Sequence, residues 1–95
     1  MTHSNSTLYL LQSCYAASAQ HIQQLAAILQ AEDHVVLMGD CVLQHQHALF
    51  SQHSNCYVLA QDLANLNHQA HHLHVLDYAE FADLCLSIQR CISFK

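Results

Sequence analysis

Short apolar runs alternate along the chain with longer segments in which apolar residues recur every three or four positions. The short runs predict buried strands, because a strand that is covered on both faces is continuously apolar. The longer segments predict helices, because residues three and four apart share one face of a helix. The predicted strands are residues 8–11, 35–38, 56–59 and 74–76, with an edge strand at 91–94, and the predicted helices are residues 16–30, 42–51 and 78–88, with a short one at 62–66.

This alternation predicts a single three-layer α/β domain with a mostly parallel sheet of four or five strands and helices on both faces. Parallel strands need crossover connections, and such crossovers are right-handed almost without exception. A flavodoxin-like strand order is the arrangement that we expect for such a chain. The 95 residues contain no proline, so we expect residues 1–95 to form one domain, with residues 1–6 as a flexible N-terminus.

The composition leaves few charged residues to cover the surface of a monomer. Charged residues make up 9% of the chain and apolar residues 53%, whereas an average domain has about 25% charged residues. Uncovered apolar surface usually marks a partner site. We therefore expect a subunit of a larger assembly, with a homo-oligomer as one state of the isolated chain.

The charge balance argues against direct binding of nucleic acid. Two basic residues, Arg90 and Lys95, stand against seven acidic ones, and the formal net charge is −5, so the chain offers no basic track for phosphates. No apolar run approaches the ~20 residues that span a membrane. The N-terminal residues lack the basic segment and apolar stretch of a signal peptide. We expect a cytoplasmic protein without membrane contact.

Five cysteines, an odd number without a CxxC pair, predict reduced cytosolic thiols rather than a disulfide framework. Cys41 follows strand 35–38 and falls in the first turn of a helix, where the peptide dipoles favour a reactive thiolate. Cys14 follows strand 8–11 at the same expected edge of the sheet, so the two could form a dithiol or persulfide-handling pair. The alternative, which we favour, is that Cys41 is a small apolar residue in the turn, because the charge of Asp40 opposes thiolate formation.

Ten histidines raise the question of a metal site. His68, His71, His72 and His74 could bind a transition metal if their segment folds around it. Their spacing matches no structural zinc pattern, and histidine also serves here as a polar surface residue, so we expect no metal. The chain lacks the GxxxxGKS/T, GxGxxG, HExxH and GxSxG motifs. We therefore expect no cofactor and no catalytic residues, so that the chain is not an enzyme by itself.

Four segments, in the same order, resemble the sequence pattern of one family. They are Leu-Leu-Gln-Ser at 10–13, Val-Val-Leu-Met-Gly-Asp-Cys-Val at 35–42, Tyr-Val-Leu-Ala-Gln-Asp-Leu at 57–63 and Leu-Asp-Tyr-Ala-Glu-Phe-Ala-Asp-Leu at 76–84. This set is similar to the DsrH/TusB family, the small subunits of the DsrEFH and TusBCD sulfur-relay complexes. The most specific block is Asp77-Tyr78-x-x-Phe81, which follows a predicted strand.

The chain departs from the family at positions that bear on chemistry. Cys14 stands where members often have proline, Cys41 where they have glycine, and Leu66-Asn67 where Arg-Gly is usual. Leu25 stands where some DsrH branches carry a cysteine. No functional cysteine of the family therefore transfers to this chain, and the TusB-like branch fits better.

The resemblance implies a DsrE-like fold and a structural, non-catalytic role in a cytoplasmic complex. The partners would be TusC/TusD-like (DsrF/DsrE-like) sister subunits in a heterohexamer, one of which holds the sulfur-accepting cysteine. The relay would pass persulfide sulfur toward 2-thiouridine at the wobble position of tRNA. The alternatives are a persulfide carrier in its own right through Cys41 or Cys14, a DsrEFH-type subunit for sulfur oxidation, and a histidine-rich metal-binding module.

Overall fold

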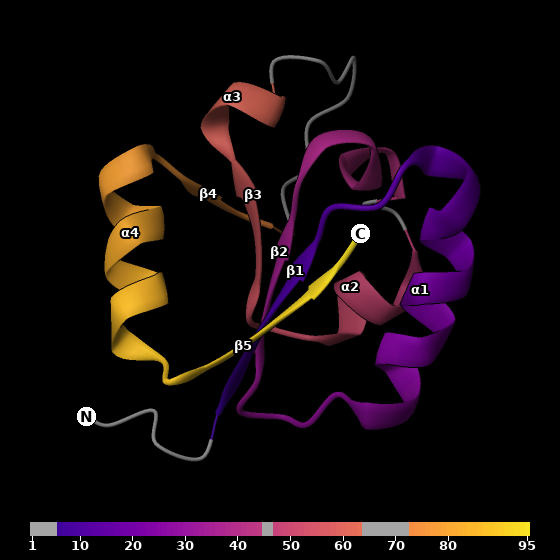
Figure 1. Ribbon diagram of the computed structural model, residues 1–95, viewed down its shortest axis with the longest axis horizontal. Coiled ribbons are helices and arrows are strands. Elements are labelled where there is room, and N and C mark those ends of the chain that lie inside the picture. Colours follow the sequence, from indigo (N-terminus) through magenta and orange to yellow (C-terminus); the bar gives the residue numbers. More distant parts are fainter. Residues whose placement is uncertain (1–5, 45–46, 64–72) are drawn as a thin grey trace.

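The computed structural model describes residues 6–44, 47–63 and 73–95. Within them, strands and helices alternate and form one sheet with helices on both sides (Figure 1). The strands are β1 (Thr7–Leu11), β2 (His34–Leu37), β3 (Cys56–Leu59), β4 (His74–Leu76) and β5 (Arg90–Phe94). The helices are α1 (Tyr15–Ile28), the 3₁₀ helix η1 (Gly39–Gln44), α2 (Ala48–Gln52), α3 (Ala60–Leu63) and α4 (Tyr78–Ser87). This element order confirms the α/β class that the sequence predicts.

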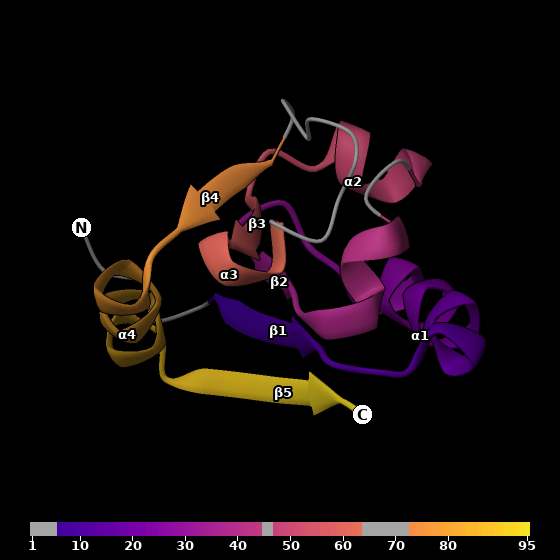
Figure 2. The same ribbon diagram turned by 90° about the horizontal axis from the view of Figure 1, so that it is seen from above.

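The five strands described are all parallel and lie in the order β4-β3-β2-β1-β5. From β1 to β4 the chain adds each strand on the same side of the previous one, and right-handed crossovers keep the connecting helices of such a series on one face. From β4 the chain returns across the sheet to the free edge of β1, so α4 lies on the opposite face. Figure 2 shows α1 and α2 on one side of the sheet and α4 on the other.

This strand order differs from the flavodoxin-like order that the alternation of elements suggested, and that detail of the prediction was wrong. In a flavodoxin-like sheet β1 lies between β2 and β3, whereas here it lies between β2 and β5. The difference arises because β2 pairs with both β1 and β3, which leaves the outer edge of β1 for the last strand. The tail predicted as an edge strand from residue 91 occupies that edge, beginning at Arg90.

Side chains alternate between two cores, one on each face of the sheet, because successive residues of a strand point to opposite faces. The core on the α1 side contains Tyr9, Leu11, Val35, Leu37, Cys56 and Val58 from the strands and Ile22, Leu25 and Phe50 from the helices. The core on the α4 side contains Leu8, Leu10, Val36, Leu59, Leu76 and Ile88, against which Phe81 and Leu84 of α4 pack. The helices on the α1 side are more deeply buried than α4. The three helical residues of that core are fully buried, whereas no residue of α4 is buried.

The helix predicted for residues 42–51 is replaced by two shorter helices. The first, η1, begins at Gly39, whose φ of +56° lies in the left-handed region that favours glycine. The second, α2, begins after His47, whose ψ of 141° is not helical and whose Nδ1 accepts the Leu49 N–H at 3.1 Å. A non-helical residue that caps a helix start interrupts any helix that would continue through it. Residues 45–46 lie outside the described residues.

Some expectations fall on other parts of the chain that the structure does not describe. They concern residues 1–5 of the expected flexible N-terminus, residues 64–66 of the predicted short helix, and three of the four histidines considered for a metal. The short helix α3 begins at Ala60, two residues before its predicted start. Among the helices described, none is long and apolar enough to cross a membrane.

Candidate functional site

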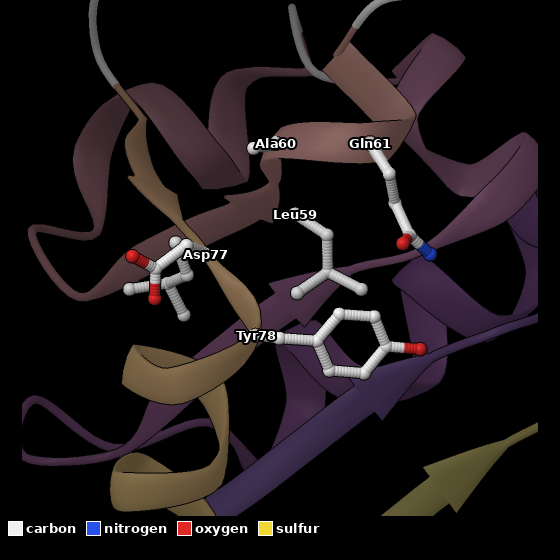
Figure 3. A pocket seen from close by; sticks show the side chains of 6 residues that line it. Leu59, Ala60, Gln61, Asp77 and Tyr78 are labelled. Carbon is white, nitrogen blue, oxygen red and sulfur yellow. The ribbon is translucent and has the colours of Figure 1, made fainter.

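The carboxyl ends of β3 and β4 border a small hollow at the point where the chain changes direction across the sheet (Figure 3). The chain leaves β1 and β2 toward the α1 face, but it leaves β4 toward α4 on the opposite face (Figure 2). Open parallel sheets bind their ligands outside the carboxyl ends of the strands. The hollow has a volume of about 200 Å³ and is lined by Leu59, Ala60, Gln61, Leu76, Asp77 and Tyr78.

The hollow is apolar at its base and polar at its border. Leu59 and Leu76 are the last residues of their strands and are only 7% and 8% exposed. Gln61 points toward the hollow from α3, and the ring of Tyr78 projects across it from the start of α4 (Figure 3). The volume is below the ~300–1,000 Å³ of small-molecule pockets. The hollow therefore fits one large apolar side chain better than a cofactor.

Asp77 caps the start of α4. Its Oδ1 accepts the Glu80 N–H at 2.8 Å, and the Glu80 Oε1 accepts the Asp77 N–H at 3.0 Å, which together form a capping box. Phe81, one residue later, packs against the core on the α4 side. The Asp-Tyr-x-x-Phe block thus has a structural explanation at its first and last positions. Its second residue, Tyr78, is 76% exposed at the border of the hollow.

One hydrogen bond joins two of the four family-like segments at the same edge of the sheet. The Gly39 N–H donates to Asp62 Oδ2 at 3.1 Å. This bond ties the turn after β2 to α3, so Asp62 of the third segment holds the turn that leads into Cys41. The second and third segments therefore act together in shaping this edge.

Cys41, the first thiol singled out from the sequence, lies in η1 and is 1% exposed. Its Sγ donates a hydrogen bond to the carbonyl oxygen of Ser13 at 3.4 Å. Burial raises the pKa of this thiol and outweighs the hydrogen bonds with Ser13, while the nearby Asp40 and Cys14 raise it further. At neutral pH Cys41 is therefore a protonated thiol inside the protein, as its interpretation as a small apolar residue requires.

Cys14, the second candidate thiol, directly precedes α1 and is exposed. The structure places it near Cys41, because β1 and β2 are paired neighbours and the charge on Cys14 affects the pKa of Cys41. The sequence-based expectation that both thiols stand at one edge of the sheet is thus confirmed. The pair combines one accessible sulfur with one inaccessible sulfur.

Next to these thiols lies a polar cluster that the sequence analysis missed. The hydroxyl of Ser13 donates to the Phe94 carbonyl oxygen at 3.3 Å and is also hydrogen-bonded to His21 Nδ1. The cluster links the end of β5 to α1, and no spacing in the sequence signals it because its members come from distant segments.

Of the four histidines considered for a metal, the structure describes His74. His68, His71 and His72 lie outside the described residues. His74 is exposed on the edge strand β4, and its ring centroid is 5.5 Å from that of Tyr57. In the described part of the chain, no three metal-ligating side chains come together. The structure therefore gives no support to a metal site at His74.

These features define the class of protein as a small α/β domain whose described strands are all parallel, with an apolar hollow at the carboxyl ends of β3 and β4 and a buried thiol at the same edge. The family model described as DsrH like protein matches residues 12–91, so the chain belongs to this family. No curated protein and no solved structure matches the chain. The family match confirms the resemblance carried by the four segments. In general terms, the protein is a sulfur-relay subunit.

Proposed function

We propose that the chain is a non-catalytic, TusB-like subunit of a cytoplasmic sulfur relay that serves 2-thiolation of the wobble uridine in tRNA. The observation that carries the proposal is the burial of Cys41, which is 1% exposed and has a raised pKa. A cysteine that passes sulfur on must be an accessible thiolate when it reacts. Cys41 does not meet this requirement, and the family resemblance assigns the sulfur-accepting cysteine to a sister subunit.

The position of Leu25 supports the TusB-like branch over branches that carry a thiol in the first helix. Leu25 stands in α1 where some DsrH branches have a cysteine, and it is fully buried in the core on the α1 side. A side chain at this position packs inside the domain. Helix α1 of this chain therefore offers neither the thiol nor an open position for one at residue 25.

The surface supports a place in a complex with TusC/TusD-like sister subunits, as in a heterohexamer. Large apolar side chains remain exposed, among them Leu43 at 53% and Leu86 at 85%. The two basic residues, Arg90 and Lys95, lie in β5 and at the end of the sequence. Because so few cations are available for phosphates, recognition of tRNA would fall to other components.

Native mass spectrometry tests this function directly. The chain is incubated with a persulfide-loaded cysteine desulfurase, with and without the candidate sister subunits from the same host. We expect the chain to gain no sulfur and to join a defined hetero-oligomer, because its subunit role requires contacts and no chemistry. Uptake of one sulfur by the isolated chain, or failure to join the sister subunits, would contradict the proposal.

The exposure of Cys14 supports a second candidate function, that of a persulfide carrier. Of the two thiols singled out from the sequence, Cys14 is the one that a persulfide donor can reach. The carrier function predicts that sulfur uptake is lost in Cys14→Ser and kept in Cys91→Ser, which changes another exposed thiol. Equal uptake by both variants would remove Cys14 from consideration.

A further inference from the structure

The turns that follow β1 and β2 lie side by side, and each carries a cysteine. The Met38 N–H donates to the Leu11 carbonyl oxygen at 2.9 Å, so the pairing of the two strands continues beyond their last residues. The Cys41 N–H then donates to the Met38 carbonyl oxygen at 3.2 Å. These bonds hold the backbone of Cys41 beside the segment that leads from β1 to α1, in which Cys14 directly precedes the helix.

The side chain of Cys41 contacts that segment directly. Its Sγ donates to the Ser13 carbonyl oxygen at 3.4 Å, and this carbonyl belongs to the peptide bond that joins Ser13 to Cys14. In a trans peptide the carbonyl oxygen and the next Cα lie on the same side, roughly 2.8 Å apart. Cys41 Sγ is therefore no more than about 6 Å from the Cα of Cys14. In a disulfide the corresponding distance is roughly 4 Å, so a movement of about 2 Å or less closes the gap.

The two thiols differ in access to solvent, which sets the order in which they react. Cys14 is exposed, whereas Cys41 is 1% exposed and burial raises its pKa. A thiol-reactive molecule in solution therefore meets Cys14 first. Cys41, which contacts the adjoining peptide rather than solvent, then reacts with the group that Cys14 has taken up.

The other three of the five cysteines lie elsewhere in the fold. Cys56 is the first residue of β3, at the opposite edge of the sheet from the turns after β1 and β2. Cys85 lies in α4 and packs against the core on the α4 side. Cys91 is in register with Leu8 of that core, so it belongs to the same face. Cys41 is therefore the thiol that Cys14 can reach while the fold is kept.

We infer that Cys14 and Cys41 form a reversible intramolecular disulfide, which gives the protein a redox-modification site at the carboxyl edge of its sheet. With a small disulfide such as oxidised glutathione, the Cys14 thiolate attacks one sulfur and releases one glutathione, which takes up a proton. The Cys41 thiolate then attacks the Cys14 sulfur of the mixed disulfide and releases the second glutathione. In total, two protein thiols lose two electrons and two protons, and oxidised glutathione gains them as two thiols.

The bridge changes both the stability and the reactivity of this edge. It replaces the contact of Cys41 with the Ser13 carbonyl by a covalent link between the start of α1 and η1, and it closes the loop of residues 14–41. Such a link stabilises a domain chiefly by restricting its unfolded chain. It also consumes Cys14, the exposed one of the two thiols, so the oxidised protein takes up no sulfur there. The inference goes beyond the proposed function and does not depend on it.

Mass spectrometry of the full chain in a series of glutathione buffers tests this bridge. The reference is Cys85→Ser/Cys91→Ser, because it removes the two thiols of the α4 face and keeps the proposed pair. After equilibration, acid quenching and alkylation, we expect the reference to lose two alkylated cysteines as the share of oxidised glutathione rises. Chymotryptic peptides that contain Cys14 and Cys41 should become linked, in wild type as well, and dithiothreitol should separate them. The thermal midpoint of the oxidised reference should lie above that of the reduced one.

Two single changes in this reference separate the roles of the thiols. Cys41→Ala should accumulate glutathione on Cys14, about tenfold or more above the reference, because the second thiol is missing. Cys14→Ser should take up neither bridge nor glutathione at Cys41, because that thiol is buried. A glutathione adduct on Cys14 that persists in the reference as it does in Cys41→Ala, or a bridge to Cys56, overturns the inference. If Cys41→Ala does not fold, the linked peptides of the reference and their loss in Cys14→Ser decide it.

Discussion

At the scale of single residues, burial separates four of the five cysteines into two kinds, and Cys85 is intermediate. Cys41 and Cys56 are 1% and 0% exposed, whereas Cys14 and Cys91 are exposed. Burial raises the pKa of Cys41, and it raises the pKa of Cys56 to about 12, because a thiolate loses its hydration inside the core. The buried thiols act as small apolar residues at neutral pH, and their ionisation affects stability only at high pH.

Cys56 makes the folded state sensitive to alkali. In the unfolded chain a cysteine ionises with a pKa of about 8.5, whereas in the folded chain the pKa of Cys56 is about 12. Between these values the unfolded state binds fewer protons, so the free energy of unfolding falls as pH rises, by up to about 1.4 kcal/mol per pH unit. Urea unfolding at a series of pH values from about 8 to 10 measures this decline.

In Cys56→Ala we expect a shallower decline than in wild type, because one of the groups that drives it is gone. Cys91→Ala removes an exposed thiol and serves as the control, with a slope close to that of wild type. If Cys56→Ala kept the wild-type slope, the ionisation of this buried thiol would not be what destabilises the fold. Any constant loss from the smaller side chain shifts the whole curve and leaves its slope unchanged.

Asp33 is the second residue whose burial has a measurable consequence. It is 3% exposed, and its carboxylate accepts the Thr7 N–H at 3.0 Å and the Gln30 N–H at 2.9 Å. Asp33→Ala leaves both N–H groups without this acceptor, at about 1–3 kcal/mol for each buried group. We expect the free energy of unfolding to fall by about 2–4 kcal/mol in a urea titration. Asp83→Ala, at an exposed position, should change it by less than about 0.5 kcal/mol.

At the scale of elements, α4 depends on its ends more than the other long helix does. In α1, Ile22 and Leu25 are fully buried, whereas α4 has no buried residue. Local interactions therefore make up a larger share of the stability of α4. One of them is the capping box between Asp77 and Glu80.

Removing the cap should loosen α4 and lower the melting temperature of the domain. Asp77→Ala abolishes the acceptor for the Glu80 N–H, which costs about 1 kcal/mol for a typical N-cap. For a domain of this size that corresponds to about 4–8 °C, measured by differential scanning calorimetry. Asp77→Asn keeps a side-chain acceptor and should lose much less. An equal loss in both variants would mean that the charge of Asp77, and not the cap, stabilises α4.

At the scale of the whole molecule, the first and last strands of the described chain pair with each other. β5 pairs with β1 along its whole length, from Thr7 with Arg90 to Leu11 with Phe94. The Gln12 N–H and the Ser13 hydroxyl both donate to the Phe94 carbonyl oxygen, at 2.8 and 3.3 Å. Strand β1, which lies between β2 and β5, therefore becomes an open edge if β5 is absent. Open edges of sheets pair with other chains and promote aggregation.

Deleting residues 89–95 should prevent the isolated chain from folding into a soluble monomer or defined oligomer. The deletion exposes the edge of β1 and removes five paired positions, which a domain of this size cannot replace. Size-exclusion chromatography and far-ultraviolet circular dichroism would show aggregated or unfolded material. Deleting Lys95 alone, outside β5, should leave both readings as in wild type. A folded protein lacking residues 89–95 would show that β5 is dispensable.

The sequence by itself determined the elements and much of the family assignment. Continuous apolar runs such as 35–38 place strands to within about one residue, because burial on both faces leaves a pattern that does not depend on neighbours. The three- and four-residue spacing of α1 and α4 is equally local. The helix predicted across residues 42–51 fails for a local reason as well, since His47 caps a new helix where the apolar pattern suggests continuation.

Only the tertiary structure decided which strands are neighbours and which side chains are exposed to solvent. The pairing of β5 with β1 joins residues about 80 positions apart, and nothing in the alternation of elements distinguishes it from a flavodoxin-like order. The contact of the buried Cys41 with Ser13, the Ser13–Phe94 hydrogen bond and the hollow at the ends of β3 and β4 likewise depend on how the strands are arranged in the sheet. The physical reason is that strand pairing and solvent exposure depend on segments distant in sequence, whereas turns, caps and amphipathic periods depend on residues close by.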